Sequence, residues 1–120
     1  MSQVGYGASD TLGSPFQTIN AVASQAITAT SSALVLNNAA SVPNVAITLP
    51  LNPPDGAVFE LVSVGGTSAM TVSANTNDFI NGAAVTALTA NIAVEYRYSL
   101  NGSQAGNAAP VNARTWFRTR

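Results

Sequence analysis

Short stretches in which apolar and polar residues alternate make up most of this chain, and turn-forming residues separate them. The segment 45–49 places its three largest apolar residues on one face. The segment 92–99 places Ile92, Val94, Tyr96 and Tyr98 on one face, with Ala93, Glu95 and Arg97 on the other. A period of two over such short stretches is typical of β-strands that are buried on one side.

The most hydrophobic stretch is 57–64, which carries Phe59 and Leu61 on one face and three valines on the other. Because both faces are apolar, we expect a central strand or one that a neighbour covers. Gly65-Gly66 then predicts a tight hairpin connection to a returning strand at 69–74, with Met70 and Val72 directed inward.

Proline and glycine mark where strands end. Pro50 follows the strand at 45–49, and the run Pro53-Pro54-Asp55-Gly56 predicts a turn. Asn81-Gly82 predicts a type I′ hairpin turn. A last strand is expected at 115–118, with Trp116 as an anchor of the core because it is the largest side chain of the segment.

Together these signals predict an all-β fold without a helix, built from about eight short strands as an antiparallel β-sandwich or small barrel, jelly-roll-like in outline. The length suits a single domain, which we place at residues 24–120. No tandem repeat is evident.

Residues 1–23 differ from the rest and predict an extended N-terminal arm. They contain glycines, a proline and small polar residues, and no period of 2 or 3.6 persists. The large side chains are spaced like separate anchors, at Tyr6, Leu12, Phe16 and Ile19. Such a segment buries too little apolar area alone to offset its ordering entropy, so the arm is either a disordered tail or one that becomes ordered on another subunit.

Charge is scarce along the whole chain. Four arginines and five acids make up 8% of the residues, against about a quarter in ordinary soluble domains. Since interspersed charge normally keeps a monomer soluble, we expect other chains to cover much of the surface, beginning with copies of this one. Three arginines lie in the last seven residues, where they could contact an acidic partner or form a solvated end.

The residue inventory disfavours catalysis. Without histidine or cysteine, the usual zinc, haem, iron–sulfur and triad sites are excluded. Asp78 with Asn75 and Asn77 could offer oxygen ligands to Ca²⁺, but the spacing matches no EF-hand loop and a turn role is favoured. Glu95 and Arg97 suit a cross-strand ion pair, within one subunit or between subunits.

From this residue inventory we expect no enzyme activity and no cofactor. We also expect no nucleic-acid partner, no membrane span and no signal peptide.

From about residue 43 onward, an ordered series of strands and turns resembles a known group of proteins. The series runs through Ile47-Thr48-Leu49-Pro50, Pro54-Asp55-Gly56, Phe59 to Val64, Gly65-Gly66, Met70-Thr71-Val72, Phe79-Ile80-Asn81-Gly82-Ala83, Leu88-Thr89-Ala90-Asn91, Val94 to Tyr98 and Thr115-Trp116-Phe117. It is similar to small β-structured proteins of tailed-phage virions, namely capsid decoration (cement) proteins and related head-fibre and tail-fibre modules. The resemblance covers about two-thirds of the chain, and residues 1–42 are not matched.

This resemblance implies a trimeric, non-enzymatic virion component, made in the host cytoplasm. The expected role is to stabilise the capsid from its outer surface by bridging neighbouring subunits of the major capsid protein. The alternative is a fibre module that binds a receptor or a carbohydrate. A sugar-binding module needs exposed aromatic side chains, whereas a decoration protein would bury Tyr96, Tyr98 and Trp116. The residues we expect at interfaces are Tyr6, Leu12, Phe16, Ile19, Glu95, Arg97 and Arg118.

Overall fold

In the computed structural model, the described residues, 16–75, 78–100 and 114–120, form eleven short β-strands and no helix. The predicted all-β class is therefore confirmed for this part of the chain. None of these residues belongs to a helix long and apolar enough to cross a membrane.

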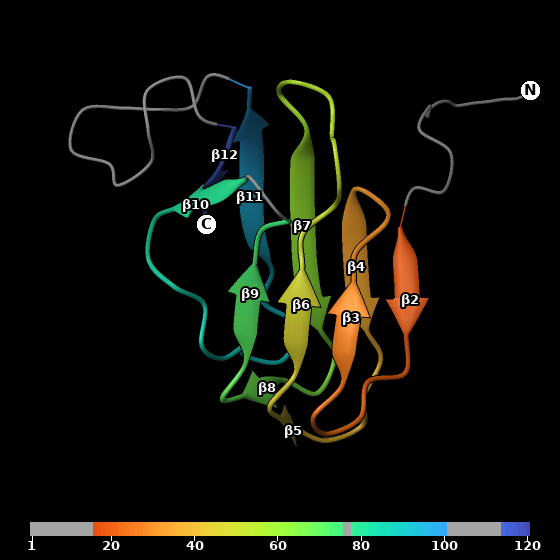
Figure 1. The fold of residues 1–120 in the computed structure, drawn as a ribbon. Helices are drawn as coiled ribbons and strands as arrows, with labels where there is room; N and C mark the ends of the chain where they lie inside the picture. The colour runs from red at the N-terminus through yellow and green to blue at the C-terminus, as the bar shows by residue number, and fades with distance from the viewer. Residues whose placement is uncertain (1–15, 76–77, 101–113) are drawn as a thin grey trace, which may run out of the picture.

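Strands β2 to β9 are arranged as three successive rungs, each of which contributes a strand to the six-stranded and to the three-stranded sheet, while rungs 2 and 3 also contribute one to a two-stranded sheet. Rung 1 contains β2 (Gln17–Ile19) and β3 (Ala26–Thr28), rung 2 contains β4 (Ala33–Leu36), β5 (Val42–Pro43) and β6 (Ala46–Thr48), and rung 3 contains β7 (Val58–Ser63), β8 (Thr67–Ser68) and β9 (Thr71–Ser73). Corresponding strands of successive rungs pair in parallel, as β2–β4–β7, β3–β6–β9 and β5–β8. Rungs 1 to 3 thus form a short β-solenoid (Figure 1).

The remaining strands extend the sheet that contains β7. They are β10 (Phe79–Asn81), β11 (Val94–Ser99) and β12 (Thr115–Arg118). β11 pairs antiparallel with β7 and with β12, and β10 pairs parallel with β12. The result is a six-stranded mixed sheet in the order β10-β12-β11-β7-β4-β2, which faces the three-stranded sheet β3-β6-β9 (Figure 1).

This pairing differs from the antiparallel sandwich or barrel predicted from the sequence. The connection at Gly65-Gly66 is a corner of the solenoid and no hairpin, because it leads to β8, and the following strand β9 pairs with β6. Asn81-Gly82 does not make a hairpin either, since β10 pairs with β12. Gly82 has a φ of 116°, and a Cβ there would lie 3.0 Å from the Cβ of Arg118, so the close passage of β12 explains the glycine.

A degenerate repeat underlies the solenoid. The sequence Ala-Ile-Thr occurs both in β3 and in β6, in register, and β9 carries Thr-Val-Ser at the same place. The central residues Ile27, Ile47 and Val72 stack on one another and pack into the core. Loops of unequal length separate the copies, and this explains why the sequence shows no regular period.

The same backbone corner precedes the second sheet in every rung. Ser24, Asn44 and Ala69 have φ angles of 62°, 60° and 48°, and each lies two residues before the aligned strands. The corners also bond to one another, since Ser24 N donates to Pro43 O at 3.0 Å and Asn44 N donates to Ser68 O at 2.9 Å. Left-handed backbone at a fixed place is therefore what turns each rung.

The core lies between the six-stranded and three-stranded sheets. β7 buries Phe59 and Leu61 and runs between β11 and β4, so its predicted central position is confirmed. Trp116 is 1% exposed and packs against Tyr98, with ring centroids 5.0 Å apart, and edge-on against Phe59 at 6.4 Å. Trp116 is therefore the core anchor that the sequence predicts.

Candidate functional site

The outer face of the six-stranded sheet is the broadest surface that the strands present. Alternation along β7 directs Phe59 and Leu61 inward and the side chains between them outward. The outer face comprises Ala33, Val35, Val58, Glu60, Val62, Glu95, Arg97 and Phe117, which are half-buried except for the exposed Arg97. It is thus largely apolar, with its charges gathered in one place.

That charged cluster is built around Arg120. Glu60 and Glu95 are direct partners across β7 and β11, where two like charges would repel. Nη2 of Arg120 lies 3.0 Å from Oε2 of Glu60 and 3.2 Å from Oε2 of Glu95, and so bridges the two carboxylates. The hydroxyl of Thr119 donates to Glu95 Oε1 at 2.9 Å. The hydrogen bond from Thr119 first, and Arg120 second, lower the pKa of Glu95.

Arg97 and Arg118 make different contacts. Arg97 lies two residues from Glu95 on the outer face but forms no ion pair with any described residue, so the cross-strand ion pair of Glu95 is made with Arg120. Arg118 donates from Nη1 to Ala83 O at 3.1 Å and from Nε to Arg120 O at 3.1 Å. It thereby fixes the backbone at the end of the chain.

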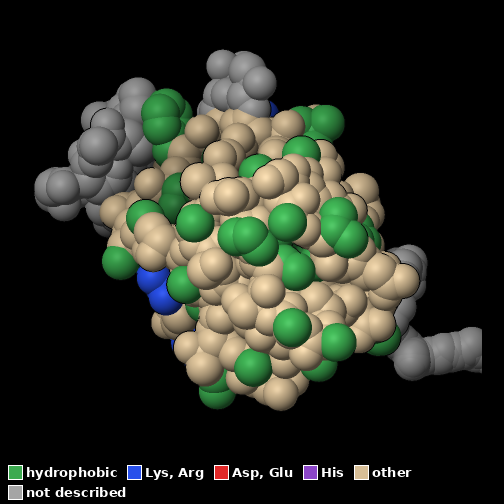
Figure 2. All heavy atoms as spheres, turned by 90° about the horizontal axis from the view of Figure 1, so that it is seen from below, with side chains coloured by type: hydrophobic (Ala, Val, Ile, Leu, Met, Phe, Trp, Pro, Cys, Tyr) green, Lys and Arg blue, Asp and Glu red, His purple; other side chains and the backbone are tan. Residues whose placement is uncertain are grey.

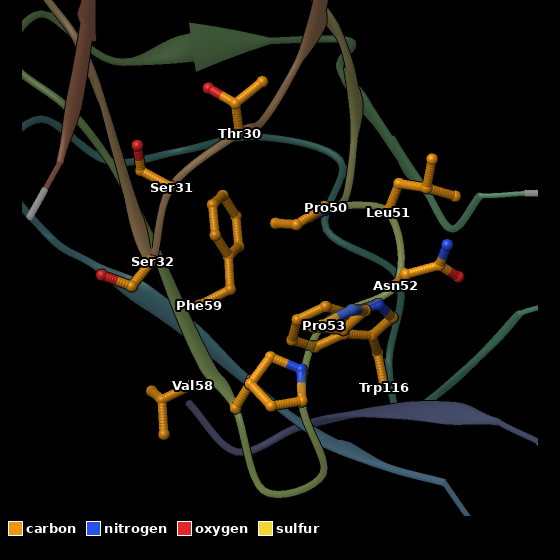
Figure 3. A pocket seen from close by; sticks show the side chains of 12 residues that line it. Thr30, Ser31, Ser32, Pro50, Leu51, Asn52, Pro53, Val58, Phe59 and Trp116 are labelled. Carbon is orange, nitrogen blue, oxygen red and sulfur yellow. The ribbon is translucent and has the colours of Figure 1, made fainter. Parts of the chain in front are cut away.

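A hollow of about 520 Å³ lies at one end of the core, between the turn at 30–32 and the loop at 50–54 (Figure 3). Phe59 and Trp116 lie beneath it and are 0% and 1% exposed, so a group in the hollow would meet the more exposed lining residues above these two rings. The exposed Leu51 contributes to its wall, and none of the lining residues is charged. A neutral apolar group is the chemistry that this hollow fits.

Asp78 is the most buried carboxylate of the described residues and belongs to an ion pair. Nε of Arg114 lies 2.8 Å from Oδ1 of Asp78, whose side chain is 1% exposed. No described residue donates an aligned hydrogen bond to either oxygen of Asp78. Burial first, and then the negative charge of Asp78, raise the pKa of Tyr98.

The calcium interpretation of this region finds no support in the described residues. Asn75 Nδ2 donates to Leu49 O at 2.8 Å, and Asp78 N donates to Asn75 O at 3.0 Å, as in a turn. No group of three or more acidic, histidine or cysteine side chains gathers among the residues that the structure describes. Asn77 lies outside them.

The predicted arm residues are only partly described. Tyr6 and Leu12 lie outside the described residues. Phe16 is 52% exposed, while Ile19 is half-buried in β2 and packs against the core. β2 falls within the range 1–23 assigned to the arm, and it pairs with β4, so the sheet begins inside that range.

Sequence reasoning missed the asparagines that hold the bend after β4, where rung 2 leaves the six-stranded sheet. Asn38 is buried, and its Nδ2 donates to Ala40 O and to Gly66 O, both at 2.8 Å. Its Oδ1 accepts a hydrogen bond from Ser63 Oγ at 2.7 Å, which ties rung 2 to rung 3. In the preceding residue, Asn37, the side-chain Nδ2 donates to Asn20 Oδ1 at 3.1 Å, which ties rung 2 to rung 1. The signal that could have found them is the repeated Ala-Ile-Thr, from which the rungs align.

Comparison with models of protein families, with curated proteins and with solved structures finds no match to this chain.

Proposed function

We propose that this chain is a structural virion protein that decorates the outer surface of a phage capsid and stabilises it by bridging neighbouring coat subunits. The observation that carries the proposal is the burial of Tyr96, Tyr98 and Trp116, each 1% exposed. Aromatic side chains that serve a sugar-binding platform must be exposed, whereas these three belong to the core.

The distribution of charge supports a role in protein contact. Glu60 and Glu95 are both paired with Arg120, and Asp78 is paired with Arg114, so few charges are available for chemistry. The outer face offers half-buried apolar side chains around the Arg120 cluster, which is the composition of a polar–apolar protein interface. The major capsid protein is the proposed partner.

Multivalency supplies the mechanism. Each copy contributes a modest contact, and linked copies engage the lattice at high effective concentration. A homo-oligomer, which the family resemblance suggests is a trimer, would provide this linkage without any metal, nucleotide or covalent step.

The hollow floored by Phe59 and Trp116 favours a second candidate, a head-fibre or tail-fibre module that binds a receptor. Its neutral lining suits an apolar or uncharged group of a host surface molecule.

The experiment compares phage particles made with and without this chain. We expect particles that lack it to assemble with normal geometry but to release DNA at a lower temperature or under milder chelator stress. Equal stability combined with a defect in adsorption to cells would favour the fibre module. Absence of the chain from purified particles would overturn both proposals.

A further inference from the structure

The two ends of the solenoid differ in how their strand edges are covered (Figure 1). Beyond rung 3, the larger sheet continues through β11, β12 and β10. Rung 3 also bonds to the segment that follows, because Met70 N donates to Thr86 O at 2.9 Å and Thr67 bridges to Leu88. At the opposite end, β2 and β3 are the last described strands of their sheets.

Hydrogen bonds show which backbone groups of rung 1 face outward. In β3 and its flanks, Gln25 O and Ala29 N are bonded to Ala46 N and Thr48 O of rung 2, at 2.9 and 2.8 Å. Successive residues of a strand direct their N–H and C=O groups to opposite edges. The N–H and C=O groups of Ala26 and Thr28 therefore point away from β6.

The same holds for β2. Ile19 O accepts a hydrogen bond from Asn37 N at 2.8 Å, so the neighbouring Thr18 directs its backbone groups away from β4. Among the described residues, no strand pairs with the outer edges of β2 and β3, and such edges readily accept another strand.

Two of the usual protections of a strand edge, charged side chains and proline, are missing from β2 and β3, although both strands are short, with three residues each. Natural proteins blunt edges with charged side chains, especially lysine, or with proline. The sequence contains no charged residue between Asp10 and Asp55, and neither β2 nor β3 contains proline. Figure 2 views the β5–β8 end, a different side of the molecule from the rung 1 edge, and shows scattered hydrophobic side chains with a small basic patch.

We propose that the exposed edge of rung 1 is a joint at which a second copy of this chain binds head to head. A two-fold axis perpendicular to both sheets places β2 against β2 and β3 against β3 of the other copy, antiparallel, so that both sheets continue across the joint. Head-to-tail stacking does not fit, because the six-stranded sheet extends beyond rung 3 whereas the three-stranded sheet stops at β9. The association therefore closes at two copies and does not grow into a filament.

This joint is independent of the proposed capsid role, and it links copies in pairs whether or not each also belongs to a trimer. Its test is the mass of the full-length chain in solution, measured by light scattering after size exclusion over a range of concentrations. We expect a species of two chains, or of an even multiple, that grows with concentration.

Edge variants with a charge-matched control locate the joint. Thr18→Lys/Thr28→Lys adds two lysines to exposed positions of the rung 1 edge, where the two-fold axis brings like charges together. Thr71→Lys/Ser73→Lys adds the same charge to exposed positions of β9, at the other end of the three-stranded sheet. We expect the first variant to weaken pairing at least about tenfold and the second to pair like the unmodified chain. Circular dichroism checks that both are folded.

Amide hydrogen exchange distinguishes two ways in which the rung 1 edge could be covered, by a second copy or by another part of the same chain. We expect protection of the Ala26 and Thr28 amides to increase with protein concentration. Protection that is independent of concentration would mean that the same chain covers the edge, and would overturn the proposal. A chain that is monomeric throughout, a trimer insensitive to the edge lysines, or an equal effect of both variants would overturn it as well.

Discussion

The solenoid of rungs 1 to 3 and the C-terminal strands β10 to β12 both consist of short strands, but the two regions pair their strands differently. In the solenoid, described residues 16–75 include only Asp55 and Glu60 as charged residues, and the strands of successive rungs pair in parallel. In the C-terminal strands, β11 pairs antiparallel on both sides, and ion pairs and aromatic rings hold the ends.

The difference follows from repetition. A repeated corner lets neutral side chains stack on their equivalents, so the backbone and buried asparagines provide the specificity. The C-terminal strands have no equivalent to stack on, and their register depends on individual side chains. The solenoid should therefore respond to changes at corners, and the C-terminal strands to changes of large or charged residues.

The largest effect is expected from Trp116→Ala in the C-terminal strands. Loss of the indole removes the contacts with Tyr98 and Phe59 and leaves a cavity, which should lower the free energy of unfolding by about 3–5 kcal/mol. Urea unfolding followed by circular dichroism measures it. Trp116→Phe keeps part of the packing and should cost less. Equal losses for the two variants would mean that ring packing is not the cause.

Asn38→Ala is the corresponding change at a corner of the solenoid. It leaves Ala40 O, Gly66 O and Ser63 Oγ without their present side-chain partner, and we expect a loss of about 2–3 kcal/mol. The same urea titration serves. Asn38→Asp retains the acceptor for Ser63 but removes both donors, so it should be at least as destabilising. If Asn38→Ala left the free energy of unfolding unchanged within experimental error, the side-chain hydrogen bonds of Asn38 would not stabilise the solenoid.

Acid should weaken the C-terminal strands through Glu95. Its pKa is lowered from 4.5 in the folded protein, chiefly by the hydrogen bond from Thr119, so its stabilising contribution is present above that value and is lost as pH falls through the folded pKa. We expect the melting temperature to fall with acidification in this range. Glu95→Gln should reduce the slope, and added salt should do so too because the ion pair with the exposed Arg120 is open to solvent on one side. An unchanged slope in Glu95→Gln would count against this linkage.

The smallest effect is expected at the third corner of the solenoid. Ala69 has a φ of 48°, which lies in the left-handed region. This conformation raises the free energy of a residue that has a Cβ but not that of glycine. Ala69→Gly should therefore raise the free energy of unfolding, by up to about 1 kcal/mol, because the relief of about 1–2 kcal/mol of left-handed strain exceeds the entropy that glycine adds to the unfolded chain. Asn44→Gly is the matched control, and it should change stability less because asparagine tolerates this conformation. Destabilisation by Ala69→Gly would show that the methyl group packs usefully.

The sequence by itself determined several of the strands and their faces, although Ile92, which alternation placed with Val94 and the two tyrosines, precedes β11 and is 60% exposed. Period-two alternation correctly assigned Phe59 and Leu61 to the core, the turn at Pro54-Asp55-Gly56 is present with Ala57 N donating to Pro54 O at 3.0 Å, and Trp116 is buried as predicted. These features are local, because alternation and turn chemistry depend only on neighbouring residues.

Only the tertiary structure decided which strands pair. Alternation is the same in parallel and antiparallel sheets, so the pattern could not distinguish a sandwich from a solenoid. The choice depends on the left-handed corners at Ser24, Asn44 and Ala69. Of these three residue types only asparagine commonly adopts this conformation, and the corners align only once the rungs are stacked. The partner of Glu95 was hidden for the same reason, since Arg120 reaches it only because β12 pairs with β11.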